Sequence, residues 1–165
     1  MVKPVTPFLY DQAFRLQEEL SFSPHIRLPV DGNNVNRALI FQHYTEDFLS
    51  FMQSGPVSRS QVKRILWDIL KGIAACHSKD WVHCGNDFLY YLHDLKELVW
   101  LLTSIWYLDT DVKPNNVLIS YTSRSGGVRE IDRVSLSDIE DATRVKSGEG
   151  VFVQVGNVLW RSPEA

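Results

Sequence analysis

The chain has 165 residues, of which 44% are hydrophobic, and this length and composition are typical of one globular domain. Its formal net charge is −3, and acidic and basic residues are mixed without a basic stripe. We therefore expect no nucleic-acid partner and no anionic membrane surface. The two cysteines form no C-x-x-C pair and no signal-like segment opens the chain, so we expect an intracellular protein of the cytoplasm or nucleus.

The first third of the chain predicts short helices and strands in alternation. Apolar residues at helical spacing indicate a helix over Asp11–Leu20, which ends before Ser23-Pro24. The residues that follow predict a strand over Ile26–Val30, a turn at Asp31–Asn34, a second strand over Ala38–Phe41, and a small helix over Phe48–Met52.

The strongest helical pattern of the chain begins at Ser58, and Ser58 or Ser60 can cap its first turn. Its apolar residues recur at steps of three and four, which predicts a buried face made of Val62, Ile65, Leu66, Ile69, Leu70, Ile73 and Ala74. After this helix we expect a brief extended segment at Trp81–His83, a hairpin formed by Val117–Tyr121 and Arg133–Leu136, and a loop beyond Asp138.

The hexapeptide Asp-Val-Lys-Pro-Asn-Asn at Asp111–Asn116 carries the most chemistry. An Asp, a Lys two places on and an Asn five places on can together serve one phosphoryl transfer. The same residues are also ordinary turn chemistry before a short strand, so the hexapeptide alone leaves both interpretations open.

Four further segments stand in a fixed order around this hexapeptide. Cys76–His83 ends the long helix before it, Leu136–Glu140 and Arg161–Glu164 follow it, and Ala38–Asp47 forms a strand and polar turn upstream. The hexapeptide resembles the catalytic loop of protein kinases, and Cys76–His83 resembles the end of the helix before that loop. Leu136–Glu140 and Arg161–Glu164 resemble the DFG and APE motifs, and Ala38–Asp47 resembles the strand and hinge that receive the adenine. The chain therefore resembles a protein kinase, and Lys113-Pro114 favours the serine/threonine type.

This resemblance implies ATP and Mg²⁺ as cofactors and a protein substrate as partner. It assigns the catalytic base to Asp111, the phosphate-facing cation to Lys113, and the Mg²⁺ ligands to Asn116 and Asp138. It also places Phe41 beside the adenine, the backbone of Gln42 and Tyr44 in the hinge, and Asp47 at the ribose. For this last group, an ordinary strand end followed by a polar turn remains the alternative.

The N-terminal part departs from the kinase pattern. No G-x-G-x-x-G sequence occurs, and Lys3 is the only lysine before Lys63, so we expect the first three strands of the small lobe and their lysine to be missing. In the helix that survives, the position of the expected Glu falls within 12–14, where no Glu stands. The chain also ends one residue after Glu164, so we expect a kinase domain that is truncated at both ends.

A segment between His83 and Asp111 interrupts the kinase spacing, and removing Cys84–Asp109 restores it. We interpret this segment as an insertion, with an unspliced intron as one possible origin, and we expect it to displace His83 from the catalytic loop. Phe88–Leu108 predicts an apolar helix. A membrane span is disfavoured, because Asp94, Lys96 and Glu97 near its middle would each cost roughly 2.5–3.5 kcal/mol.

Taken together, the sequence predicts an α+β protein with a partial kinase-like fold. Residues 1–47 would form the end of the small lobe and the hinge, and residues 48–165 the first part of the large lobe with the insertion at 84–109. Ile139-Glu140 replaces Phe-Gly of the DFG motif, which removes the freedom of glycine and adds a negative charge beside Asp138. Two functions stay open: a serine/threonine kinase, or a non-catalytic pseudokinase fragment that binds a protein partner.

Overall fold

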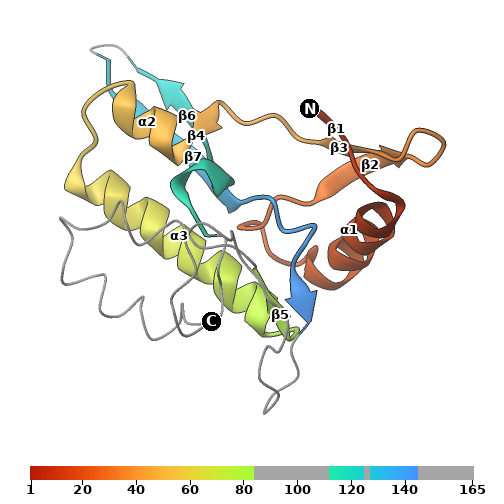
Figure 1. Ribbon diagram of the computed structural model, residues 1–165. Coiled ribbons are helices and arrows are strands. Elements are labelled where there is room, and N and C mark those ends of the chain that lie inside the picture. Colours follow the sequence, from red (N-terminus) through yellow and green to blue (C-terminus); the bar gives the residue numbers. More distant parts are fainter. Residues whose placement is uncertain (84–111, 125–126, 145–165) are drawn as a thin grey trace, which may run out of the picture.

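A computed structural model of the chain describes residues 1–83, 112–124 and 127–144. Within these residues, helices lie beside small antiparallel sheets (Figure 1). The predicted α+β class is confirmed at this level. The predicted helix at Phe88–Leu108, the rest of the segment 84–109, Asp111 and the motif Arg161–Glu164 lie outside the described residues.

The first sheet has the strand order β1-β3-β2, with β1 at Val2–Pro4, β2 at Pro29–Asn33 and β3 at Ala38–Phe41. The strand predicted at Ala38–Phe41 is confirmed. The strand predicted at Ile26–Val30 begins three residues later, because Ile26 instead forms an isolated parallel bridge with Leu136. β1 was not predicted, since three residues beside prolines are too few to show the period of a strand.

Helix α1 spans Pro7–Leu20 and covers this sheet. It begins four residues before the predicted start because Thr6 is its N-cap, accepting a hydrogen bond from the backbone N–H of Leu9 at 3.4 Å, and because Pro7 suits the first helical position. The helix buries one face, which consists of Tyr10, Gln12, Ala13, Leu16 and Leu20.

Helix α2 at Phe48–Gln53 and the long helix α3 at Arg59–His77 confirm the other two helical predictions. Ser58 caps α3 in a capping box with Gln61, as the sequence predicts for one of its two serine candidates. The predicted face of α3 is buried or half-buried except at Ala74, which is exposed, while Gly72, Ala75 and Cys76 are buried in addition.

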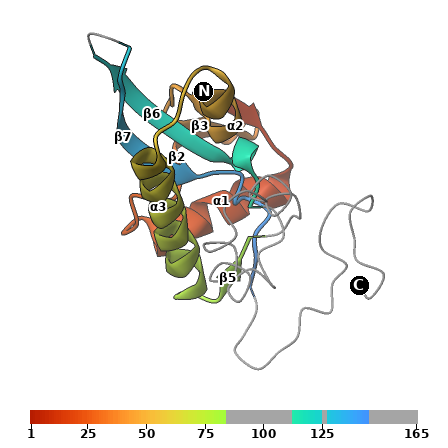
Figure 2. The ribbon, with the colours of Figure 1, turned by 90° about the vertical axis from the view of Figure 1, so that its left-hand side faces the viewer.

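The second sheet has the order β4-β6-β7, with β4 at Glu46–Asp47, β6 at Val117–Ser123 and β7 at Arg129–Leu136. The predicted hairpin is therefore confirmed, although both strands are longer than expected. The 3-10 turn η2 at Pro114–Asn116 leads into β6. Figure 2 shows β6 and β7 running side by side above α3.

After β7 the chain crosses toward α1 and then descends to β8 at Thr143–Arg144 (Figure 1). β8 pairs with β5 at Trp81–Val82, which is the brief extended segment expected after α3. Residues 137–144 therefore connect the second sheet to α1 and to the end of α3.

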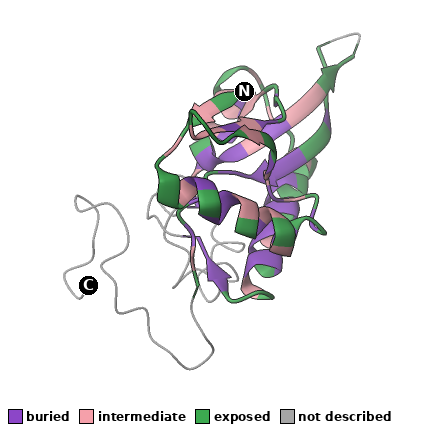
Figure 3. Cartoon of the chain, turned by 90° about the vertical axis from the view of Figure 1, so that its right-hand side faces the viewer, coloured by how far each residue is buried: buried purple, intermediate pink, exposed green. Residues whose placement is uncertain are grey.

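The larger hydrophobic core joins α3, α2, β6 and β7 to the inner face of α1, and a smaller one lies between α1 and β3. Figure 3 shows the buried residues gathered on the interior strands and helix faces. At Gly72 a Cβ atom would lie 2.8 Å from the backbone oxygen of His25, so α3 packs directly on the backbone of that segment. Within the described ranges, no helix is long and apolar enough to span a membrane.

Candidate functional site

Three charged side chains meet where β1 faces the segment after β7. Lys3 Nζ lies 2.5 Å from Asp138 Oδ1 and 3.3 Å from Glu140 Oε2. We call Lys3, Asp138 and Glu140 the Lys3 cluster. Lys3 reaches it from the middle of β1, where it pairs with Leu39 of β3. The strand β1 that carries Lys3 was not predicted from the sequence.

The members of the Lys3 cluster differ in exposure. The Asp138 side chain is 50% exposed, that of Lys3 32%, and that of Glu140 only 7%. Burial of Lys3 lowers its pKa, but the hydrogen bond to Asp138 and the charges of Glu140 and Asp138 more than offset this, so the pKa is raised. Lys3 thus stays protonated and presents a cation between two carboxylates.

Asp138 has a backbone φ of 61°, in the left-handed region that non-glycine residues seldom adopt. Aspartate is among the residues that tolerate this region best, and such conformations cluster at functional sites. The backbone at this point turns out of β7, and it directs the half-exposed carboxylate toward Lys3.

The predicted metal ligand Asn116 is connected to this turn through Ser137. The backbone N–H and the hydroxyl of Ser137 both donate to the carbonyl oxygen of Asn116, at 2.7 and 3.0 Å. Asn116 is buried at the end of η2. The structure therefore brings the segments of the two predicted Mg²⁺ ligands, Asn116 and Asp138, next to each other.

His83 is buried, and its Nε2 lies 2.9 Å from the carbonyl oxygen of Ser137. The same Ser137 contacts Asn116, so His83 reaches the described end of the predicted catalytic loop through one residue. Because Asp111 and the segment 84–109 lie outside the described residues, the expected displacement of His83 from the catalytic loop stays a prediction. The residues just before His83 are held by the pairing of β5 with β8.

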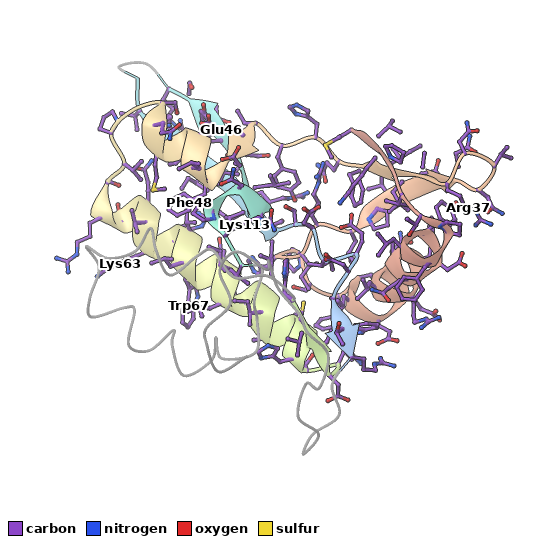
Figure 4. The ribbon with its side chains drawn as sticks, in the orientation of Figure 1. Arg37, Glu46, Phe48, Lys63, Trp67 and Lys113 are labelled. Atoms are coloured by element: carbon purple, nitrogen blue, oxygen red, sulfur yellow. The ribbon has the colours of Figure 1, made fainter. Side chains whose placement is uncertain are left out.

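Lys113 is half-buried and stands just before η2 (Figure 4). Its backbone carbonyl accepts a hydrogen bond from the N–H of Asn116 at 2.9 Å, which closes the turn. The predicted base Asp111, two residues earlier, lies outside the described residues.

The predicted hinge residues are held by other parts of the protein. Phe41 is buried, and the guanidinium of Arg27 lies 4.8 Å from its ring centroid. Arg27 also donates to the backbone oxygen of Gln42 at 2.9 Å, and Arg133 donates to the side-chain oxygen of Gln42 at 2.5 Å. The carbonyl predicted to receive the adenine thus already has a donor within the chain.

Tyr44 and Asp47 also have structural partners. The Tyr44 hydroxyl donates to Ser135 Oγ at 2.7 Å, which ties the hinge segment to β7. Asp47 is the N-cap of α2, where its carboxylate oxygens accept from the backbone N–H and the hydroxyl of Ser50, at 2.9 and 3.0 Å. A cap of this kind accounts for Asp47 without a ligand.

Gln12 lies at the start of positions 12–14, the range in which the kinase pattern would place a helical Glu. Its amide nitrogen donates to the backbone oxygens of Glu140 and Ala142, at 2.6 and 2.9 Å, and its side chain is buried. A carboxylate could not donate either bond. The amide at this position therefore fastens α1 to the segment that carries Glu140.

Sequence reasoning missed three residues of this region: Lys3, Glu140 as its partner, and Arg27. The one sequence signal for Lys3 was a lysine beside a β-branched residue ahead of a helix, which is too common to be specific. Arg27 gave no signal, because a lone arginine within a strand-like segment is usually exposed.

The residue types at the two predicted ligand positions suit a magnesium ion. A carboxylate, as in Asp138, and an amide, as in Asn116, are among the few protein ligands that Mg²⁺ uses when phosphate oxygens and water complete its shell. The structure joins the segments of Asn116 and Asp138 through Ser137, and the Asp138 carboxylate pairs with Lys3. Among residues 1–83, 112–124 and 127–144, no group of three His, Cys, Asp or Glu side chains could hold a metal alone. Comparison with models of known families and with curated proteins found no match for this chain.

Proposed function

We propose that the chain is a kinase-like domain that binds MgATP at the Lys3 cluster and belongs by descent to the serine/threonine protein kinases. The observation that carries the proposal is the contact of 2.5 Å between Lys3 and Asp138. In protein kinases, a strand lysine contacts the phosphates and an aspartate holds the Mg²⁺ that bridges them, so the two side chains serve one nucleotide. The order lysine strand, helix, hinge strand, catalytic turn and aspartate turn also agrees with that family.

Each group has a role that follows from its charge. Lys3 would contact the phosphates, and Asp138 and the side chain of Asn116 would hold Mg²⁺, which neutralises charge on the phosphate oxygens when it is bound. Lys113 would face the transferred phosphoryl group. Transfer to a hydroxyl of a protein substrate also needs a base, and Asp111 is the residue that the sequence assigns to this step.

Binding without transfer, as in a pseudokinase, is the second candidate. It is favoured by the hydrogen bond that Arg27 donates to the Gln42 carbonyl, because that bond already uses one of the two lone pairs that an adenine could reach. In that case the domain would serve as an interaction module for a protein partner.

The binding proposal is tested with purified chain, titrated with ATP in the presence and absence of Mg²⁺. Asp138→Asn should weaken MgATP binding about tenfold or more, which corresponds to about 1.4 kcal/mol. Asp80→Asn is the matched control, because Asp80 is also exposed and has a φ of 60°. Asparagine tolerates this backbone as aspartate does, so neither variant strains the chain.

Equal MgATP affinity in the two variants, or no Mg²⁺-dependent binding in the unaltered chain, would overturn the proposal. Transfer is scored separately, by following the γ-phosphoryl group of labelled ATP onto a mixed protein substrate. Binding with transfer supports the kinase, and binding without transfer supports the second candidate.

A further inference from the structure

Glu140 is a buried carboxylate that faces a lysine. Its side chain is 7% exposed, and within the described part of the chain its ion pair is with Lys3, at 3.3 Å. A buried carboxylate is costly unless a cation compensates it, so this contact is unlike the many exposed ion pairs of a protein surface. Glu140 therefore depends on Lys3 for compensation of its charge, while Lys3 is shared between Glu140 and Asp138.

The backbone of Glu140 is held from both sides. Gln12 of α1 donates to the backbone oxygen of Glu140, and the N–H of Ala142 donates to the oxygen of Ile139 at 2.9 Å. Ile139 and Ala142 are both buried in the larger core. The carboxylate of Glu140 thus projects from a fixed turn, whereas the carboxylate of Asp138, which also pairs with Lys3, is half-exposed to solvent.

Protein kinases orient their strand lysine with a glutamate of the helix that follows it. In this chain the helix offers Gln12, which is committed to two backbone oxygens. We infer that Glu140 is the positioning residue for Lys3, and that it orients the lysine toward nucleotide phosphates while Asp138 turns to the metal. This inference rests on the proposed function.

A different role for the same contact makes an opposite prediction. If Glu140 merely neutralised Lys3 and kept phosphates away, its removal would strengthen MgATP binding. If Glu140 orients Lys3, its removal leaves the ammonium with more freedom and weakens binding, because the lysine must then be ordered when the nucleotide binds. The direction of the change separates the two roles.

The experiment uses the full chain and the variants Glu140→Gln, Glu140→Asp and Lys3→Met. Glu130→Gln is the control, because Glu130 also forms an ion pair, with Arg124, but is exposed on the β6–β7 hairpin. The first measurement is the rate at which an acylating reagent modifies the Lys3 amine, relative to the exposed Lys63 in the same sample. The second is the affinity for MgATP, measured well below the unfolding temperature of each variant.

Glu140→Gln should raise the relative labelling rate of Lys3 about two- to fivefold, the range expected for the loss of one partly exposed ion pair. Glu140→Gln should also weaken MgATP binding, and Glu140→Asp should weaken it less. In a chain that already carries Lys3→Met, Glu140→Gln should not change the affinity for MgATP further. Glu130→Gln should change neither quantity. If Glu140 contributed only to folding, Glu140→Gln would weaken MgATP binding to the same extent with or without Lys3.

Unchanged labelling of Lys3 in Glu140→Gln, or tighter MgATP binding, would overturn the inference. A chain that binds no MgATP at all overturns the proposed function instead. The labelling rate then decides alone whether Glu140 holds Lys3, so the two failures can be told apart.

Discussion

The Lys3 cluster and the hinge segment Phe41–Asp47 were both assigned to one nucleotide site, yet they differ in how their polar groups are used. In the Lys3 cluster, charged groups from distant parts of the chain converge and one carboxylate stays half-exposed. In the hinge segment, the polar groups of Gln42, Tyr44 and Asp47 are paired with Arg27, Ser135 and Ser50. Charged groups that converge without a role in a helix cap or a turn indicate a ligand site better than polar groups that already have structural partners. The Lys3 cluster is therefore the better candidate.

The strongest way to break this comparison is to disturb the backbone that carries Glu140. Gln12→Glu would place a carboxylate against the two carbonyl oxygens that now accept from the amide. Because no donor replaces the amide, we expect a loss of about 3 kcal/mol in the free energy of unfolding, measured by denaturant titration at neutral pH.

Gln17→Glu is the control for this change, since Gln17 lies on the same helix but is only half-buried. It should cost well under about 1 kcal/mol. A similar loss in both variants would mean that Gln12 does not fasten α1 to the turn after Asp138, and the Lys3 cluster would lose one of its supports.

Helices and the hairpin were predictable because their signals are local. Ser58 and the residues three and four apart after it determine α3 almost to its ends, and Ala38–Phe41 stands between turn residues. Thr6-Pro7 is also a local start signal, although the apolar spacing placed the beginning of α1 later. Such features depend on neighbours in the sequence and not on the rest of the fold.

The contacts of the Lys3 cluster could not be predicted, because Lys3 and Asp138 stand 135 positions apart in the sequence. Lys3 meets Asp138 only after β1 pairs with β3 and the segment after β7 crosses to α1. His83 illustrates the same limit. Its Nε2 lies beside the carbonyl oxygen of Ser137, 54 residues away in the sequence, and no local pattern of the sequence indicates that contact.

A second prediction sharpens the assignment of Asp47. Asp47→Ala removes the cap of α2 and should lower the free energy of unfolding by about 1 kcal/mol, whereas Asp47→Ser keeps a capping oxygen and should restore most of that loss. Both variants lack the carboxylate. If Asp47→Ser binds MgATP as the unaltered chain does and Asp47→Ala binds it more weakly, Asp47 acts through the cap of α2. If the affinity for MgATP falls equally in both variants, the carboxylate contacts the nucleotide, as the sequence predicts.

The smallest expected change in stability is at Arg27. Its guanidinium lies over the Phe41 ring and donates to Gln42. Its Nε, however, is buried and has no hydrogen-bond partner among the described residues, and burial lowers the pKa of Arg27. These gains and costs nearly balance, so Arg27→Met, which keeps the apolar stem, should shift the free energy of unfolding by less than about 1 kcal/mol.

The effect of Arg27→Met on the affinity for MgATP is the sharper test of the hinge. If the hinge binds adenine, the freed Gln42 carbonyl should strengthen MgATP binding several-fold in a titration, while inorganic triphosphate, which has no base, should bind as before. Equal affinity of ATP for both proteins would mean that this nucleotide site consists of the Lys3 cluster without the hinge.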